Sequence, residues 1–144
     1  QSKAQKSIQS NLIQKMNKTK MTAVIDIYDE FLNDIITNTV ESATINYWAE
    51  LTNYIVDSNG QTPSVIIRED EEGAFEEELG EWVTVDKDFI IKGIEKIVNN
   101  KFQVSDSIHK EILTGVYRND GSYIDIECCD CIIQAAMFGE LVYG

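Results

Sequence analysis

The sequence predicts a single α+β domain, in which a small antiparallel sheet of about three strands packs with about four helices. Three observations predict this class. The chain has 144 residues, a common size for one domain, and 43% of them are hydrophobic, which is enough for one core. Apolar residues recur at helical spacing in several stretches. Shorter stretches rich in aromatic and β-branched residues are bounded by turn signals, as strands are.

The first predicted helix of the body covers residues 24–40, where apolar residues recur every three or four positions with acidic residues between them. Residues 45–56 are rich in aromatic and β-branched residues and predict a strand, which a turn signal at residues 57–60 ends. Two further strands are expected at residues 64–68 and 81–85. An acidic stretch joins them as a hairpin.

Three more helices are expected after the sheet. Asp86 is the expected N-cap of a helix that runs to about residue 99, and the next helix begins at Ser105 or Asp106. Asp125 precedes the last predicted helix.

The last helix is expected over residues 128–138, with Gly139 ending it in the left-handed conformation that glycine adopts easily. It holds all three cysteines. With the single histidine they are the only soft metal ligands of the chain: Cys128, Cys129, Cys131 and His109. Helix positions i, i+1 and i+3 do not share one face, so we expect buried reduced thiols here and no metal site.

Charge divides the chain into a basic N-terminal arm, residues 1–20, and an acidic α+β domain, residues 21–144. The arm contains five Lys and no acidic residue, whereas the whole chain has a formal net charge of −13, so the domain carries −18. Four apolar residues of the arm recur at helical spacing: Ile8, Leu12, Ile13 and Met16. The arm is expected to be either a mobile tail or a helix that docks on the body or on a neighbouring subunit, which gives a route to a homo-oligomer.

The predicted hairpin carries eight carboxylates within thirteen residues: Glu69, Asp70, Glu71, Glu72, Glu76, Glu77, Glu78 and Glu81. The alternating ligand pattern of a calcium-binding loop is absent. A solvated loop and a contact surface for a basic protein both fit this composition. An acidic body repels nucleic acids and anionic membranes over about 8 Å at physiological salt, so direct binding to either is not expected.

Tyr47 and Trp48 fall in the predicted strand at residues 45–56, where alternation sends them to opposite faces. One of the two is expected to face the core. The other lies beside Asn46 and Glu50 and predicts either ordinary strand packing or a contact site for a small molecule or a protein.

Sequence motifs of the common enzyme classes are absent: the chain has no GxGxxG, Walker A, HExxH or GxSxG pattern. No catalytic residue and no cofactor are therefore expected. The apolar runs are far shorter than the roughly 20 residues of a membrane-spanning helix, and the first twenty residues lack the apolar centre of a secretory signal. The cytoplasm is the expected location.

Two stretches resemble a family of small uncharacterised proteins encoded by tailed bacteriophages and prophages. The first is Thr-Ile-Asn-Tyr-Trp-Ala-Glu at residues 44–50. The second is the segment at residues 130–144, which ends in Phe-Gly-Glu-Leu-Val-Tyr-Gly where the family has Phe-Gly-Glu-Val-Val-Tyr-Gly. The family commonly has Gly-Gly where this chain has Ala43 and Thr44, and it usually lacks the Cys128-Cys129 pair. The resemblance spans residues 21–144 and is specific at those two stretches.

The resemblance implies a phage or prophage accessory protein of the bacterial cytoplasm, without implying an activity. Combined with the aromatic stretch, it gives these candidate binding residues: Asn46, Tyr47, Trp48, Glu50, Asp130 and Gln134. The leading hypothesis is non-catalytic binding of the acidic hairpin to a host or phage macromolecule, for example as an inhibitor of a defence or nucleic-acid enzyme. The alternatives are a protein that binds a nucleotide signal through the candidate binding residues and a hydrolase that uses carboxylates and a metal.

Overall fold

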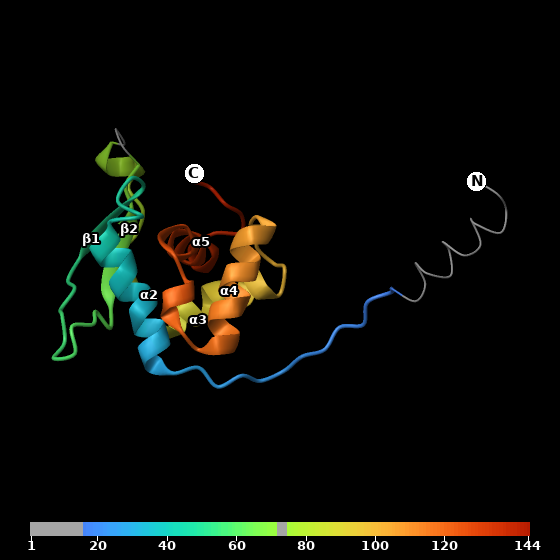
Figure 1. The fold of residues 1–144 in the computed structure, drawn as a ribbon. Helices are drawn as coiled ribbons and strands as arrows, with labels where there is room; N and C mark the ends of the chain where they lie inside the picture. The colour runs from blue at the N-terminus through green and yellow to red at the C-terminus, as the bar shows by residue number, and fades with distance from the viewer. Residues whose placement is uncertain (1–15, 72–74) are drawn as a thin grey trace, which may run out of the picture.

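A computed structural model describes residues 16–71 and 75–144 and confirms the α+β class. Helix α2 (Asp29–Ser42) precedes a three-stranded sheet, and helices α3 (Lys87–Val98), α4 (Asp106–Arg118) and α5 (Ile126–Met137) follow it. Two short 3-10 helices, η1 (Glu76–Glu78) and η2 (Gly121–Tyr123), lie in the connections. Figure 1 shows the sheet on one side of the helices. Most of the predicted arm, residues 1–15, lies outside the described residues.

The sheet is antiparallel, as the sequence predicts, and its strand order is β1-β2-β3. Its strands are β1 (Ala49–Thr52), β2 (Val65–Glu69) and β3 (Val83–Val85). Glu50 pairs with Arg68 in the first ladder, and Ile67 pairs with Val83 in the second. Ile67 is completely buried, whereas Glu50 and Arg68 are partly exposed, so one face of the sheet packs on the core and the other faces solvent.

The predicted strand over residues 45–56 is wrong in its extent, because only Ala49–Thr52 pair with β2. The residues before it form turns, in which the Trp48 amide donates to the carbonyl of Ile45 at 3.0 Å. A strand would send Ile45 and Trp48, three residues apart, to opposite faces. In the turn both side chains are completely buried. Asn53, with φ of 52°, ends the strand.

The first predicted helix begins at Asp29 and not at residue 24. The side chain of Asn119 holds the preceding backbone extended: it accepts from the Tyr28 amide at 2.9 Å and donates to the Asp26 carbonyl at 2.9 Å. Val24 is 97% exposed, so a helix that began at residue 24 would gain no packing against the core there.

The predicted N-cap at Asp86 is confirmed, and Ser105 and Asp125 also act as N-caps, with α5 beginning at Ile126 and not at residue 128. Asp86 accepts from the Phe89 amide at 3.0 Å, Ser105 from Ile108 at 3.3 Å, and Asp125 from Cys128 at 2.9 Å. The predicted left-handed end at Gly139 is wrong, because the positive-φ residues of the described chain do not include it. The chain leaves α5 through an extended Phe138, which directs the last residues back over the core.

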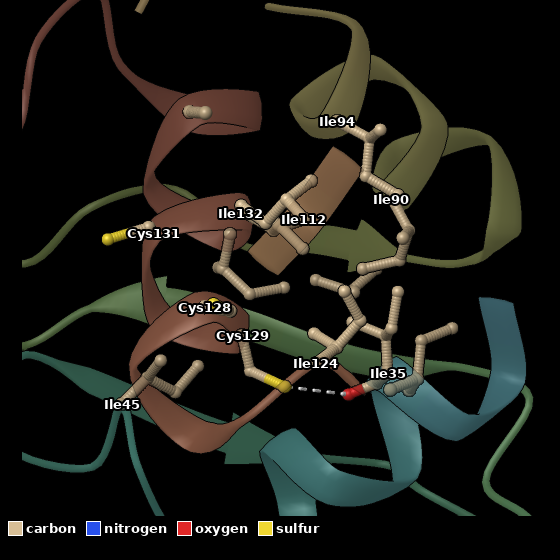
Figure 2. Close-up of a cluster of buried hydrophobic side chains, with 14 of the residues drawn as sticks. Ile35, Ile45, Ile90, Ile94, Ile112, Ile124, Cys128, Cys129, Cys131 and Ile132 are labelled. Atoms are coloured by element: carbon tan, nitrogen blue, oxygen red, sulfur yellow. Dashed lines mark hydrogen bonds between the residues drawn. The ribbon is translucent and has the colours of Figure 1, made fainter. Parts of the chain in front are cut away.

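Helix α5 lies at the centre of the core, and most of its side chains are buried (Figure 2). It approaches α3 so closely that a Cβ added at Gly93 would lie 2.2 Å from the carbonyl oxygen of Ile132. Glycine is therefore required where the two helices cross. None of the helices within residues 16–71 and 75–144 combines the length and the apolar character that crossing a bilayer requires.

Candidate functional site

Four of the six candidate binding residues meet at the carboxylate of Asp130. This side chain projects from α5 toward the turn that carries the two aromatic residues. Its Oδ2 accepts from the Tyr47 hydroxyl at 2.6 Å, and its Oδ1 accepts from Trp48 Nε1 at 2.9 Å. Gln134, one helical turn further along α5, also donates to Oδ1 at 2.9 Å.

The two aromatic residues differ in exposure, as the sequence predicts: Trp48 is completely buried and Tyr47 is 46% exposed. The turn produces this difference, and not the strand alternation that predicted it. Partial burial and the hydrogen bond to the Asp130 carboxylate raise the pKa of Tyr47 well above its ordinary value. The Tyr47 hydroxyl therefore remains a neutral donor to Asp130 over a wide pH range.

The C-terminal residues complete this group of contacts. The Gln134 side chain accepts from the backbone amides of Val142 and Tyr143 at 3.1 and 3.0 Å and donates to the Tyr143 carbonyl at 3.1 Å. The Tyr143 ring stacks on Trp48, with 5.1 Å between centroids and an interplanar angle of 5°. We call Trp48, Asp130, Gln134 and Tyr143 the Trp48 cluster.

Tyr143 also connects the Trp48 cluster to the sheet. Its hydroxyl donates to Glu69 at the end of β2 at 2.6 Å. Burial and this carboxylate raise the pKa of Tyr143 to about 12. Sequence reasoning did not select Tyr143 as a site residue, although the resemblance covers its position.

Asn46 and Glu50 lie apart from the Trp48 cluster. Both line a hollow of about 350 Å³ with Asp70 and Tyr54. Glu50 forms an ion pair with Arg68, with 2.7 Å between the closest nitrogen and oxygen. The side chains predicted as one site therefore lie in two places.

The acidic residues predicted as a contact patch lie mostly in the loop between β2 and β3, which we call the acidic loop (residues 70–82). Figure 1 shows η1, which lies within this loop, beyond the helices at one end of the sheet. The exposed acidic residues are Glu71, Glu76, Glu77 and Glu81. Glu69 and Asp70 are partly buried at the base of the loop. Glu72 and the side chain of Glu78 lie outside the described part of the chain.

Two aromatic side chains accompany these charges. Phe75 is 67% exposed and Trp82 is 44% exposed. The Arg68 guanidinium lies 4.4 Å from the centre of the Trp82 ring. The ion pairs found among the described side chains, Arg68–Glu50 and Lys87–Asp29, use no carboxylate of the acidic loop.

The three cysteines are free and buried, which confirms the prediction of buried thiols. Figure 2 shows Cys129 pointing toward Ile35, whose carbonyl its Sγ contacts at 3.8 Å, while Cys131 points to another side of α5. Burial raises the pKa of Cys129 to about 12 and that of Cys131 to about 11. Thiolate chemistry at neutral pH is therefore unfavourable.

Cys128 lies beside two carboxylates that the sequence did not associate with it. The ligand atoms of Cys128, Glu111 and Asp125 lie within 4.8 Å of one another. The thiol donates to Glu111 at 3.2 Å, and Asp125 accepts from the Cys128 amide. Burial and the hydrogen bond to Glu111 raise the pKa of Cys128, which opposes the deprotonation that a metal–thiolate bond requires. This trio is accounted for by hydrogen bonds within the protein.

In comparisons with known proteins, no family model, no curated protein and no solved structure matches this chain.

Proposed function

We propose that this chain is a non-catalytic accessory protein of a phage or prophage and that its acidic loop binds a basic surface of a host or phage protein. The observation that supports this most is the combination within one loop of exposed carboxylates and exposed aromatic rings. Exposed charges steer association with a basic surface, and aromatic side chains supply the contacts that dominate binding energies.

The base of the acidic loop is held to the core, which favours binding because less order must be created on association. The Asp70 amide donates to the Trp48 carbonyl at 2.8 Å, and the Gly80 amide donates to the Glu69 carbonyl at 3.0 Å. The Glu69 side chain accepts from Tyr143. The Trp48 cluster thus holds the base of the acidic loop in place through the hydrogen bond from Tyr143 to Glu69.

The geometry supports nucleotide binding at the Trp48 cluster less well. Tyr143 covers one face of the Trp48 ring, and the polar groups of Asp130 and Gln134 are engaged by other parts of the chain. A base stacking on Trp48 would have to displace Tyr143 and leave the Gln134 amide without its backbone partners.

The proposal is tested by affinity capture from host lysate with a variant in which the four exposed loop carboxylates, Glu71, Glu76, Glu77 and Glu81, are changed to Gln. The control variant changes Glu41, Asp88, Glu127 and Glu140 to Gln, because these residues are exposed, lie outside the loop and alter the net charge equally. We expect the wild type and the control to retain one basic partner at low salt and the loop variant to lose it.

Salt is the second variable of this experiment. Adding about 0.5 M NaCl shortens the Debye length to a few Å and should release the captured partner. Capture that survives this salt, or that the loop variant retains, would show that the loop charges do not bind the partner. Purified partner is then titrated against all three proteins to compare dissociation constants.

A further inference from the structure

The described segment that precedes α2 exposes an unusual run of large apolar side chains. Residues 16–28 contain five of them: Met16, Met21, Val24, Ile25 and Tyr28, which are 76%, 88%, 97%, 55% and 71% exposed. We call residues 16–28 the strap. Single exposed apolar residues are ordinary, but this many in thirteen consecutive residues indicate a surface that another chain covers.

The strap is fixed to the body at one end and leaves it at the other. Asn119 holds Asp26 and Tyr28 by two hydrogen bonds, and Ile27 packs against the core. Figure 1 shows the chain running away from the helices from there toward residue 16. The N-terminal end of the strap thus leaves the body of its own chain.

Beside the fixed end of the strap lies an apolar groove of about 500 Å³. Its lining includes residues 21–23 and 25–27 of the strap, together with apolar side chains of α3 and α4: Ile91, Ile94, Val98 and Val116. Glu95 and Asp26 also line it, so the groove carries negative charge beside its apolar surface.

We propose that two copies of this chain exchange their N-terminal arms, so that residues 1–20 of one copy bind the α3 groove of the other. The arm has the complementary chemistry, with five Lys, no acidic residue, and the apolar residues Ile8, Leu12, Ile13 and Met16 at helical spacing. The body has a formal charge of −18 and attracts the arm. The direction of the strap favours the groove of a second copy over that of the same chain.

This exchange is independent of the proposed function of the acidic loop. In Figure 1 the strap joins α2 at its N-terminal end, which is the end of that helix farthest from the β2–β3 connection. Two copies joined through their arms and grooves therefore keep both acidic loops accessible. A dimer would present two acidic loops to a partner, and binding through both would increase avidity.

The experiment measures mass by light scattering during size-exclusion chromatography of the full chain over a wide concentration range. We expect a dimer of twice the 16.3 kDa chain mass. An arm variant, Leu12→Asp with Ile13→Asp, should weaken dimerisation by about tenfold or more, because charges replace two buried apolar side chains. A groove variant, Glu95→Lys, should weaken it too, because it places a positive charge against the lysines of the arm.

Two control variants match these changes in charge without altering the apolar residues of the arm or the lining of the groove. Ser10→Asp with Gln14→Asp adds the same two charges to the arm at polar positions between its apolar residues. Glu41→Lys lies on an exposed part of α2. Both should dimerise within about twofold of the wild type. Glu95 is itself exposed, so the groove variant keeps the core intact.

Mixing the arm variant with the groove variant provides the decisive result. Each mixed dimer contains one intact arm opposite one intact groove, so mixing should restore part of the dimer that neither variant forms alone. Arms that contacted only each other would give no such recovery. A wild type that is monomeric at every concentration, or a dimer that persists after removal of residues 1–20, would overturn the proposal.

Discussion

The Asp130 carboxylate accepts hydrogen bonds from the side chains of Tyr47, Trp48 and Gln134. Trp48 is completely buried. Changing Asp130 to Ala leaves Trp48 Nε1 without an acceptor, and a buried unsatisfied donor costs about 1–3 kcal/mol. We expect the free energy of unfolding to fall by this amount in urea titrations followed by tryptophan fluorescence. Asp130→Asn keeps one side-chain oxygen and should lose less. An equal loss of unfolding free energy for both variants would mean that the negative charge of Asp130, and not its role as a hydrogen-bond acceptor, stabilises the fold.

Tyr143 gives the stability a dependence on alkaline pH. Its pKa is about 12 in the folded chain and 10.0 when unperturbed, so the unfolded chain releases this proton first. The resulting stabilisation is complete below pH 10 and is lost as the pH rises to 12. Unfolding titrations across this window should show the wild type losing stability relative to Tyr143→Phe. Tyr117→Phe, at a residue that is 86% exposed, is the control and should follow the wild type.

Residue types near the Trp48 cluster were identifiable from the sequence, but their arrangement was not. The resemblance and the aromatic stretch selected Trp48, Asp130 and Gln134, and the structure brings them together. It does not place Asn46 and Glu50 with them, because Asn46 lies in the turn at residues 43–48 and Glu50 lies in β1, where it pairs with Arg68. Tyr143 is found only when the chain folds back from α5, a long-range contact with no local signal. Whether these residues bind a ligand stays a prediction.

The crossing of α3 and α5 depends on one glycine. In a helix Ala is ordinarily favoured over Gly by about 1 kcal/mol, so an unobstructed change would stabilise the chain. At Gly93 the new Cβ would lie 2.2 Å from the Ile132 carbonyl oxygen, and the helices would have to separate. We expect Gly93→Ala to lower the free energy of unfolding by about 1–3 kcal/mol in urea titrations.

Gly139→Ala is the matched control for this change, because nothing lies within 4 Å of its added Cβ. It should leave the free energy of unfolding within about 0.5 kcal/mol of the wild type. A stable Gly93→Ala protein would show that α3 and α5 can move apart without loss.

Helix starts were more predictable than the limits of other elements. The Asp86, Ser105 and Asp125 caps are local signals, since each side chain bonds an amide three residues ahead. The start of α2 depends instead on Asn119, more than ninety positions away, which no periodicity reveals. Hydrophobic periodicity at residues 24–28 was therefore a misleading helix signal, and those residues belong to the strap.

At the scale of the whole molecule, the division of charge between arm and body has structural consequences. The α+β class followed from helical periodicity in some stretches and strand-like composition in others, and it is confirmed. The phage origin, the basic partner, the cytoplasmic location and the homo-oligomer stay predictions. The two surfaces that carry the proposals are the acidic loop, which is contiguous in sequence, and the α3 groove, whose lining residues come from the strap, α3 and α4. Composition alone predicts the sign of the charge on these surfaces but not where they lie on the fold.

Salt should act in opposite directions on the stability of the body and on its associations. A body with a formal charge of −18 repels itself, and salt screens this repulsion, so NaCl should raise the thermal midpoint of a chain lacking residues 1–20 by a few degrees. The full chain has a net charge of −13 and arms that attract the body, so screening removes a favourable interaction as well as an unfavourable one. Its midpoint should therefore rise less. Thermal unfolding of both chains across the same salt series measures the difference, and a larger rise for the full chain would mean that the arm does not neutralise the body.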